Sequence, residues 1–213
     1  MVIDQRMIDY ICSLDTDDSE IVRTIEKEAI ADAVPIIRRE SRNLLRVLLK
    51  IKRPEAVLEV GTATGFSAIL MTEVLGPESH LTTIEKYEKR IPIAKENFKR
   101  AGMSERITLL EGDAADILAG MEGQFDFIFM DAAKGQYIHF MPDVMRLLSP
   151  GGILVSDNVL QDGDVVESRY AVCRRNRTIH ARMRDYLWAL KHDERLETIV
   201  LPIGDGMTIS VKE

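Results

Sequence analysis

Two carboxylates and an amide follow buried strands in this sequence. Asp131 ends the apolar run FIFM, and Asp157 and Asn158 end the run ILVS. Because ligands of a parallel sheet bind beyond the carboxyl ends of its strands, we expect these three side chains to meet at one edge. Carboxylate and amide oxygens suit a hard cation, most simply Mg²⁺. The sequence therefore predicts a magnesium site formed by Asp131, Asp157 and Asn158.

A glycine-rich turn, LEVGTATGFSA, places Gly61 and Gly65 between a strand and a helix. Its spacing lacks the middle glycine of the dinucleotide fingerprint G-x-G-x-x-G. Glu59 would repel a phosphate and favour a cation, and Glu85 at the next strand end can accept both hydroxyls of a ribose. A nucleoside with a cationic tail fits this pattern, so we expect S-adenosylmethionine rather than NAD. The structural alternative is a plain turn with surface acids.

Lys134 lies one helical turn beyond Asp131. A substrate with two neighbouring oxygens could chelate the predicted cation, which would make its hydroxyl more acidic. Lys134 could then remove the proton, and the oxyanion would attack the sulfonium methyl in line. Asp131 and Lys134 are therefore the candidate catalytic residues. The alternative for Lys134 is a salt bridge to Asp131 or exposure to solvent.

A third strand end, inside EGDA, carries Asp113. This carboxylate or its neighbouring backbone could bind an adenine edge. Asp113 could instead cap the helix that follows, and both roles can hold at once.

The elements that must position these residues alternate between strand and helix. Short β-rich runs at 56–61, 81–85, 107–113, 125–131 and 152–157 are separated by helical stretches. This order predicts an α/β fold, with a Rossmann-like mixed sheet and helices on both faces. Two further β-rich runs flank Gly204-Asp205-Gly206 and predict an antiparallel hairpin at one edge. Residues 1–50 are expected to form a helical N-terminal extension within a single domain, 1–213.

Composition fits one ordinary globular domain. The chain has 213 residues, 46% of them hydrophobic and 30% charged, without an apolar run long enough to span a membrane. Cys12 and Cys173 are too few for a disulfide framework, and the N-terminus lacks a signal-peptide pattern, so we expect a cytoplasmic protein. The net charge of −7 argues against a general nucleic-acid binder, but arginines cluster at 38–53 and 169–184.

The set LEVGTATGFSA, TTIEK, EGDA, FMDAAKGQY, SDNVL and PIGDGMTIS resembles the cation-dependent O-methyltransferases, which include the catechol and caffeoyl-CoA enzymes. The resemblance implies a seven-stranded sheet and a homodimer. It matches Asp131, Asp157 and Asn158 to metal ligands and Lys134 to a base. It also implies a set of cofactor contacts: Ile37, Glu59, Gly61, Ser67, Glu85, Asp113, Ala114 and Asp131.

Within that family, VPIIRRESRNLL, DAAKGQY and the arginine-rich stretch before YLWAL resemble bacterial tRNA 5-hydroxyuridine methyltransferases. A 5-hydroxyuridine carries a hydroxyl beside a carbonyl, and this pair could chelate Mg²⁺ much as a catechol does. Arg174, Arg175 and Arg177 lie in an insertion after Asn158 and would suit a tRNA anticodon loop. The alternatives are a small-molecule catechol or phenol O-methyltransferase, a non-catalytic cofactor- or RNA-binding module and, more remotely, a NAD-dependent oxidoreductase.

Overall fold

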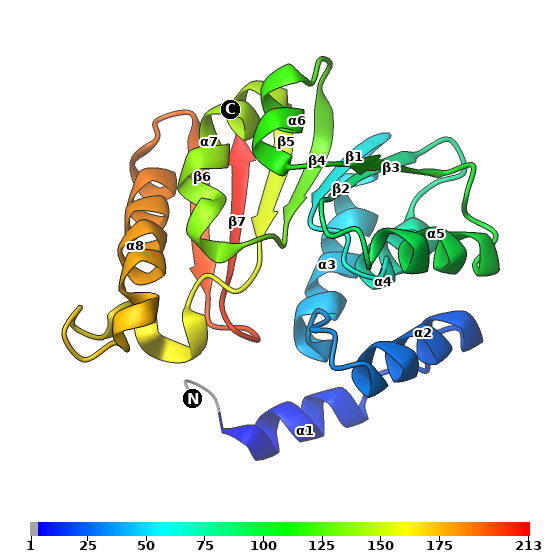
Figure 1. The fold of residues 1–213 in the computed structure, drawn as a ribbon, viewed down its shortest axis with the longest axis horizontal. Coiled ribbons are helices and arrows are strands. Elements are labelled where there is room, and N and C mark those ends of the chain that lie inside the picture. The colour runs from blue at the N-terminus through cyan, green and yellow to red at the C-terminus, as the bar shows by residue number, and fades with distance from the viewer. Residues whose placement is uncertain (1–3) are drawn as a thin grey trace.

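The computed structural model describes residues 4–213 and contains a single sheet of seven strands (Figure 1). The strands are β1 (Ala56–Val60), β2 (His80–Glu85), β3 (Ile107–Glu111), β4 (Phe125–Met130), β5 (Leu148–Ser156), β6 (Leu196–Leu201) and β7 (Met207–Lys212). They are ordered β3-β2-β1-β4-β5-β7-β6. The predicted α/β fold with a mixed seven-stranded sheet is therefore confirmed.

Residues 4–213 also form eight α-helices and three 3₁₀ turns, and α1, α2 and α3 precede the first strand. The helices are α1 (Gln5–Ser13), α2 (Glu20–Ala31), α3 (Arg39–Lys52), α4 (Phe66–Val74), α5 (Ile91–Arg100), α6 (Ala114–Gly120), α7 (Tyr137–Leu147) and α8 (Arg177–His192). The 3₁₀ turns are η1 (Lys134–Gln136), η2 (Gln161–Val166) and η3 (Arg174–Asn176). None of the helices among residues 4–213 combines the length and apolar character that crossing a lipid bilayer requires.

Helices cover both faces of the sheet because its central strands are apolar on both sides. In β4, Phe127 and Phe129 face a cluster that contains side chains of α2, α3, α4 and α5. Ile128 and Met130 alternate with them and face a second cluster, formed with α6, α7 and α8. All four side chains are fully buried. The period of two along a strand thus divides the core into two layers.

The hairpin of β6 and β7 confirms the predicted antiparallel edge and adds a detail of order. β7 pairs antiparallel with β5, from Ile153 opposite Val211 to Ser156 opposite Thr208. It also pairs antiparallel with β6, so β6 runs parallel to β5 at the outer edge. The turn between β6 and β7 consequently lies at the same end of the sheet as the carboxyl end of β5.

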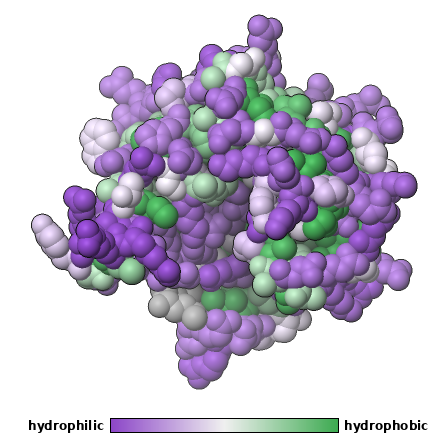
Figure 2. Space-filling model, viewed as in Figure 1, coloured by the Kyte–Doolittle hydropathy of each residue, from purple (hydrophilic) through white to green (hydrophobic). Residues whose placement is uncertain are grey.

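That end of the sheet opens into a hollow. In Figure 1 the arrowheads of β4 and β5 point downward on the side of α3 that faces α8, and Figure 2 shows the molecule in the same view with a hollow near its centre. Hydrophilic side chains gather in and around this hollow (Figure 2). The strand ends that carry the candidate residues therefore meet solvent there.

Candidate active site

A cavity of about 830 Å³ lies beyond the carboxyl ends of the parallel strands. Its size is in the range of small-molecule and cofactor sites. Its walls contain most of the residues proposed for cofactor and catalysis: Ile37, Gly61, Ser67, Glu85, Asp113, Ala114, Asp131, Lys134 and Asn158. The fold thus brings side chains from positions 37 to 158 around one space.

The turn after β1 requires glycine at Gly61. This residue has φ +108°, and a Cβ atom built on it would lie 2.1 Å from the carbonyl oxygen of Asp131. Gly65, the N-cap of α4, also has a left-handed backbone, with φ +83°. Gly61 lets the turn run close against the end of β4, and Gly65 leaves room for the ring of Phe98 in α5, in agreement with the glycine-rich sequence.

Glu59 lies behind this turn rather than in the cavity wall. It is fully buried in β1, and its carboxylate accepts hydrogen bonds from Ser67 Oγ at 2.5 Å and Thr83 Oγ1 at 2.6 Å. Burial raises the pKa of Glu59 to about 7, although both hydroxyls oppose the shift. The structure therefore differs from the expected direct contact of Glu59 with a ligand, and only its charge can act on the cavity, through Ser67 and the turn.

Glu85, at the end of β2, joins two turns of the cavity wall. Its Oε2 accepts from the backbone N–H of Ala63 at 2.8 Å, and its Oε1 accepts from the N–H groups of Lys86 and Tyr87 at 2.9 and 2.8 Å. A carboxylate has about four acceptor positions, so one position stays available for a ligand hydroxyl. The side chain is fixed in place before any ligand arrives.

Asp113 has the capping role that the sequence offered as one of two possibilities. It is the N-cap of α6, and its Oδ1 accepts from the N–H of Ala115 at 2.9 Å. This bond and the ammonium of Lys86 at 3.2 Å lower the pKa of Asp113. Asp113 and the next residue, Ala114, also line the cavity, so capping leaves them available to a ligand.

The structure brings together Asp131, Asp157 and Asn158, the three predicted metal ligands. Backbone bonds from the N–H of Asp131 to Val60 and from the N–H of Asp157 to Met130 extend the sheet past the ends of β4 and β5. Asn158 Nδ2 donates to Asp131 Oδ1 at 3.1 Å, and the backbone N–H of Asn158 donates to Asp157 Oδ1 at 2.7 Å. Asp157 lies behind the other two and is not part of the cavity wall.

Neither Asp131 nor Asp157 has a Lys, Arg or His side chain within salt-bridge distance of 4 Å among residues 4–213. Burial raises the pKa of Asp131 to about 6, while Lys134 opposes the shift. Burial and the charge of Asp131 raise the pKa of Asp157 to about 7. Two buried acids that form no salt bridge within the described residues fit a bound divalent cation, which would compensate the cost of burial. The described residues hold no group of three or more His, Cys, Asp or Glu side chains that could bind a metal ion by itself, so Asn158 is needed to complete the set.

Lys134 pairs with a residue that sequence reasoning missed. Its Nζ lies 2.8 Å from Oδ2 of Asp205, in the turn between β6 and β7, and not within salt-bridge distance of Asp131. Asp205 had been assigned only to the hairpin turn. The side chain of Asp205 is 4% exposed, which a residue between two glycines of a turn does not reveal from sequence.

Tyr137 is the second residue that the sequence did not single out. It begins α7 and is fully buried, and its hydroxyl lies 3.2 Å from the carbonyl oxygens of both Met130 and Asp157. Its single proton is shared between the two oxygens. Tyr137 therefore ties the end of β4 to the end of β5, where the predicted metal ligands lie.

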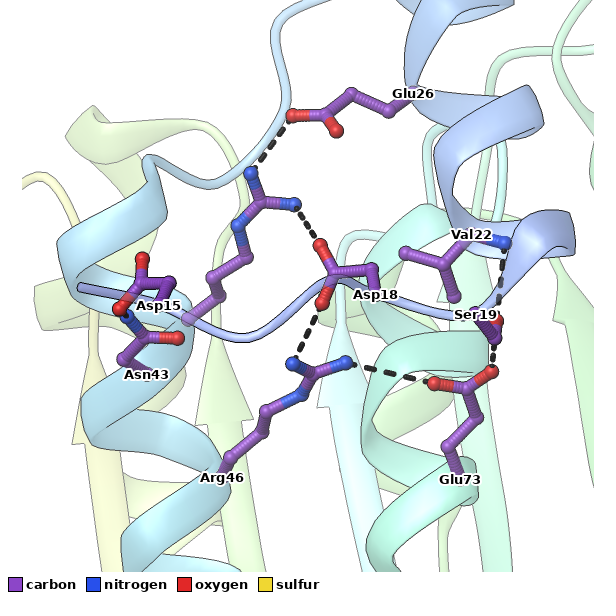
Figure 3. Close-up of polar contacts among 9 residues, drawn as sticks. Asp15, Asp18, Ser19, Val22, Glu26, Asn43, Arg46 and Glu73 are labelled. Atoms are coloured by element: carbon purple, nitrogen blue, oxygen red, sulfur yellow. Dashed lines mark hydrogen bonds and ion pairs between the residues drawn. The ribbon is translucent and has the colours of Figure 1, made fainter. Parts of the chain in front are cut away.

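The N-terminal extension forms one wall of the cavity and is held by a buried ion network. The segment Pro35–Ile37, between α2 and α3, lines the cavity. Arg42 of α3 is 2% exposed and donates to Asp18 at 3.1 Å and to Glu26 at 2.7 Å. Figure 3 shows Asp18 also joined to Arg46, which reaches Glu73 of α4. The network therefore ties α2 and α3, the helices before and after residues 35–37, to each other.

The three candidate RNA-binding arginines divide into two kinds. Arg174 and Arg175 are exposed in η3 and have no ion-pair partner among residues 4–213. Arg177 begins α8, donates to the carbonyls of Val172 and Tyr170, and lies over the Tyr170 ring at 5.9 Å. Only Arg174 and Arg175 are thus free to meet a ligand, while Arg177 shapes the loop.

Comparison with known proteins extends over most of the chain. The model of the O-methyltransferase family matches residues 12–213. Caffeoyl-CoA O-methyltransferase 1 of Eucalyptus globulus is 32% identical over 178 residues, 78% of this chain and 70% of that protein. Catechol O-methyltransferase of Niastella koreensis is 35% identical over 127 residues, 58% of each chain.

The fold also matches solved structures. An O-methyltransferase from Bacillus cereus in complex with SAH superposes with a TM-score of 0.85 over 96% of both chains, at 23% identity. That likeness concerns the fold, and the family is shown by the match over residues 12–213. The chain belongs to the O-methyltransferase family.

Proposed function

We propose that this protein transfers a methyl group from S-adenosylmethionine to a hydroxyl that stands beside a second oxygen, and that the acceptor is 5-hydroxyuridine in tRNA anticodon loops. One observation carries the reaction type. Asp131 and Asn158 lie in the wall of a nucleoside-sized cavity together with Lys134, and Asp157 lies directly behind them.

The cavity supports S-adenosylmethionine as methyl donor. Glu85 supplies a fixed acceptor for a ribose hydroxyl, and Asp113 with Ala114 lies on the expected adenine side. The buried charge of Glu59 favours a sulfonium over a phosphate. Relatives of the same fold have been solved with SAH, from Bacillus cereus, and with SAM, from Streptomyces achromogenes.

The residues also fit Mg²⁺, which Asp131, Asp157 and Asn158 would hold. A bound divalent cation makes the hydroxyl of a chelating acceptor more acidic. Lys134, once its ammonium has given up a proton, would accept the hydroxyl proton at Nζ as the free amine in the cavity wall. The cavity walls would hold the donor and the acceptor next to each other, and this proximity would supply much of the rate.

The acceptor is inferred from the surface after β5. Arg174 and Arg175 are exposed in the segment that follows Asn158 along the chain, and Tyr170 in the same segment is 86% exposed. Unpaired arginines with an exposed aromatic ring suit a single-stranded RNA loop, whose phosphates and bases they can contact. This pattern supports tRNA over a free phenol.

In the first experiment, the purified protein is incubated with labelled S-adenosylmethionine and one of two acceptors. The acceptors are tRNA that contains 5-hydroxyuridine and a simple catechol, and each is tested with Mg²⁺ and with EDTA. Label in tRNA that EDTA abolishes is expected. The double variant Arg174→Glu/Arg175→Glu should lose tRNA methylation. The matched control Lys50→Glu/Lys52→Glu, in the last turn of α3 near the amino end of β1, should keep it. Unchanged tRNA methylation in the arginine variant contradicts the RNA surface.

A small catechol or phenol is the second candidate acceptor, favoured by the 35% identity to a catechol O-methyltransferase. It uses the same cavity and the same metal ligands. Label in the catechol alone, with none in tRNA, would establish it. A protein that binds S-adenosylmethionine but labels neither acceptor would support a non-catalytic cofactor-binding module.

A homodimer remains a prediction from the family resemblance. No side chain of α1 is fully buried, Ile8 and Cys12 are partly buried, and Met7, Tyr10 and the following Leu14 are each more than half exposed. A second copy of this chain is the occupant that we propose for this apolar face. Light scattering after gel filtration should give twice the monomer mass of 24.1 kDa. The variant Tyr10→Glu/Leu14→Glu should shift the protein toward the monomer.

A further inference from the structure

The turn between β6 and β7 carries a buried carboxylate that touches two separate parts of the active site. Asp205 Oδ2 accepts from Lys134 Nζ at 2.8 Å, and Asp205 Oδ1 accepts from the backbone N–H of Asp162. The Asp205 side chain is 4% exposed, whereas that of Lys134 is 35% exposed. The carboxylate therefore holds the ammonium from the protein side, and the rest of the lysine faces the cavity.

The loop that Asp205 contacts follows directly on the predicted metal ligands. Val159 N–H donates to the carbonyl of Gly206 at 3.0 Å, and Leu160 N–H donates to the carbonyl of Asp205 at 2.9 Å. Asn158, Gln161 and Asp162 in this loop have positive φ angles of 62°, 51° and 52°. L-residues adopt this conformation at an energetic cost, so neighbouring contacts must hold the loop. The turn with Asp205 supplies those contacts.

Lys134 is fixed at its backbone from a different direction. The carbonyl of Gly135, the next residue, accepts from Arg182 Nη1 of α8 at 3.1 Å. The backbone of η1 is thus anchored to α8, while the end of the lysine side chain is anchored to the hairpin turn. Asp205 is the only carboxylate that reaches Lys134 within salt-bridge distance among residues 4–213.

We propose that Asp205 is a positioning residue that holds Nζ of Lys134 at the rim of the cavity and joins it to the loop 158–163. Its meaning for catalysis rests on the proposed methyl transfer. The restraint of Lys134 and of the loop 158–163 by Asp205 can be tested without measuring any activity. The nearly isosteric variant Asp205→Asn tests it, because Asn can still accept from Asp162 N–H but turns an N–H donor toward the ammonium.

The first readout is independent of activity. The protein is treated with limiting acetic anhydride, and the acetylation of each lysine is followed by mass spectrometry. Lys134 should react several-fold faster in Asp205→Asn than in the native protein. Lys86, which pairs with Asp113, and Lys212, which donates to the carbonyls of Met145 and Leu148, should react at unchanged rates. An unchanged rate at Lys134, or an equal rise at all three lysines, overturns the proposal.

The second readout is turnover with the acceptor that the protein methylates. Asp205→Asn should lower kcat about 10- to 100-fold, the usual cost of a misplaced catalytic group, with the affinity for S-adenosylhomocysteine unchanged. The control Asp193→Asn, which breaks the ion pair with Arg195 far from the cavity, should leave kcat as it is. A loss confined to cofactor affinity would contradict a role through Lys134. If neither tRNA nor the catechol is methylated, the proposed function is contradicted, whereas the acetylation result still tests the role of Asp205.

The reciprocal variants cover the case in which Asp205→Asn does not fold. Lys134 is partly exposed, so Lys134→Met and Lys134→Gln should both fold. Lys134→Met leaves the carboxylate without its partner, and hydrogen exchange across the loop 158–163 should accelerate. Lys134→Gln retains a donor for Asp205 and should exchange more slowly than Lys134→Met. Equal exchange in both variants and in the native protein overturns the link between the lysine and the loop.

Discussion

Ser67 donates a hydrogen bond of 2.5 Å to the buried carboxylate of Glu59, and this bond joins the helix after the glycine-rich turn to the strand before it. Burial raises the pKa of Glu59 to about 7. The residue therefore changes charge close to neutral pH, and a cationic ligand in the cavity should favour its ionised form. The affinity of a sulfonium ligand then becomes a measure of this charge.

S-adenosylmethionine should bind more tightly as pH rises through about 7, because Glu59 becomes negative. S-adenosylhomocysteine has a neutral sulfur and should show a weaker dependence. The variant Glu59→Gln should remove the difference and weaken S-adenosylmethionine by about tenfold, equivalent to about 1.4 kcal/mol. Titration calorimetry with both ligands on either side of pH 7 measures these effects. Equal weakening of the two ligands would show that Glu59 acts only through packing.

The positions of the strands along the chain and many of the residues that line the cavity could be predicted from the sequence because they follow from local patterns. Apolar runs such as FIFM identified the central strands, and the acids at their ends identified the rim of the cavity. The pairing of Lys134 with Asp205 could not be predicted, because it joins residues 71 positions apart through a hairpin turn. The position of Glu59 behind Ser67 depends in the same way on which face of β1 meets α4, and the pattern of β1 is apolar on both faces.

The stability of the metal-free protein should fall as pH rises from about 4 to about 7. Asp131 and Asp157 have pKa values of about 6 and about 7, above the 3.8 expected in the unfolded chain. The native state therefore binds more protons than the unfolded state in this interval, and stability decreases with pH. Thermal unfolding in EDTA across this range measures the slope, which Asp157→Asn should reduce.

Mg²⁺ should reverse this dependence if it binds the deprotonated acids. The rise in Tm on adding Mg²⁺ should be larger above pH 7 than below pH 6, because protons compete with the ion at low pH. Asp157→Asn should lose most of the rise. An equal increase in Tm in the variant and the native protein would mean that Mg²⁺ binds elsewhere.

Arg42→Met should destabilise the protein by about 3 kcal/mol, because it leaves Glu26 and part of Asp18 without their buried partner. Arg23→Met is the matched control. Arg23 pairs with Asp17 at 3.8 Å with both side chains at least half exposed, so its loss should cost about 0–1 kcal/mol. Urea unfolding measures both values.

The same network should affect the cofactor site. Arg42 lies over the ring of Phe66 at 5.6 Å, and Phe66 and Ile37 both line the cavity. Arg42→Met should therefore weaken S-adenosylhomocysteine binding even at temperatures where the variant is fully folded. Native affinity in the folded variant would show that the network stabilises the N-terminal extension without shaping the cavity.

Gly61→Ala should be among the most damaging single changes in the chain. An alanine Cβ at this position would lie 2.1 Å from the carbonyl oxygen of Asp131, and backbone atoms cannot withdraw as a flexible side chain can.

Gly123→Ala separates this clash from backbone strain, since Gly123 has a similar φ of +92° and no atom within 4 Å of its Cβ position. The control should cost about 1–2 kcal/mol from its left-handed backbone alone. Gly61→Ala should cost at least about 2 kcal/mol more and should displace Asp131, so that cofactor affinity and the Mg²⁺-dependent rise in Tm fall together. Equal unfolding free energies for the two variants would mean that the end of β4 yields without cost, and the close approach of Gly61 would then have no part in fixing Asp131.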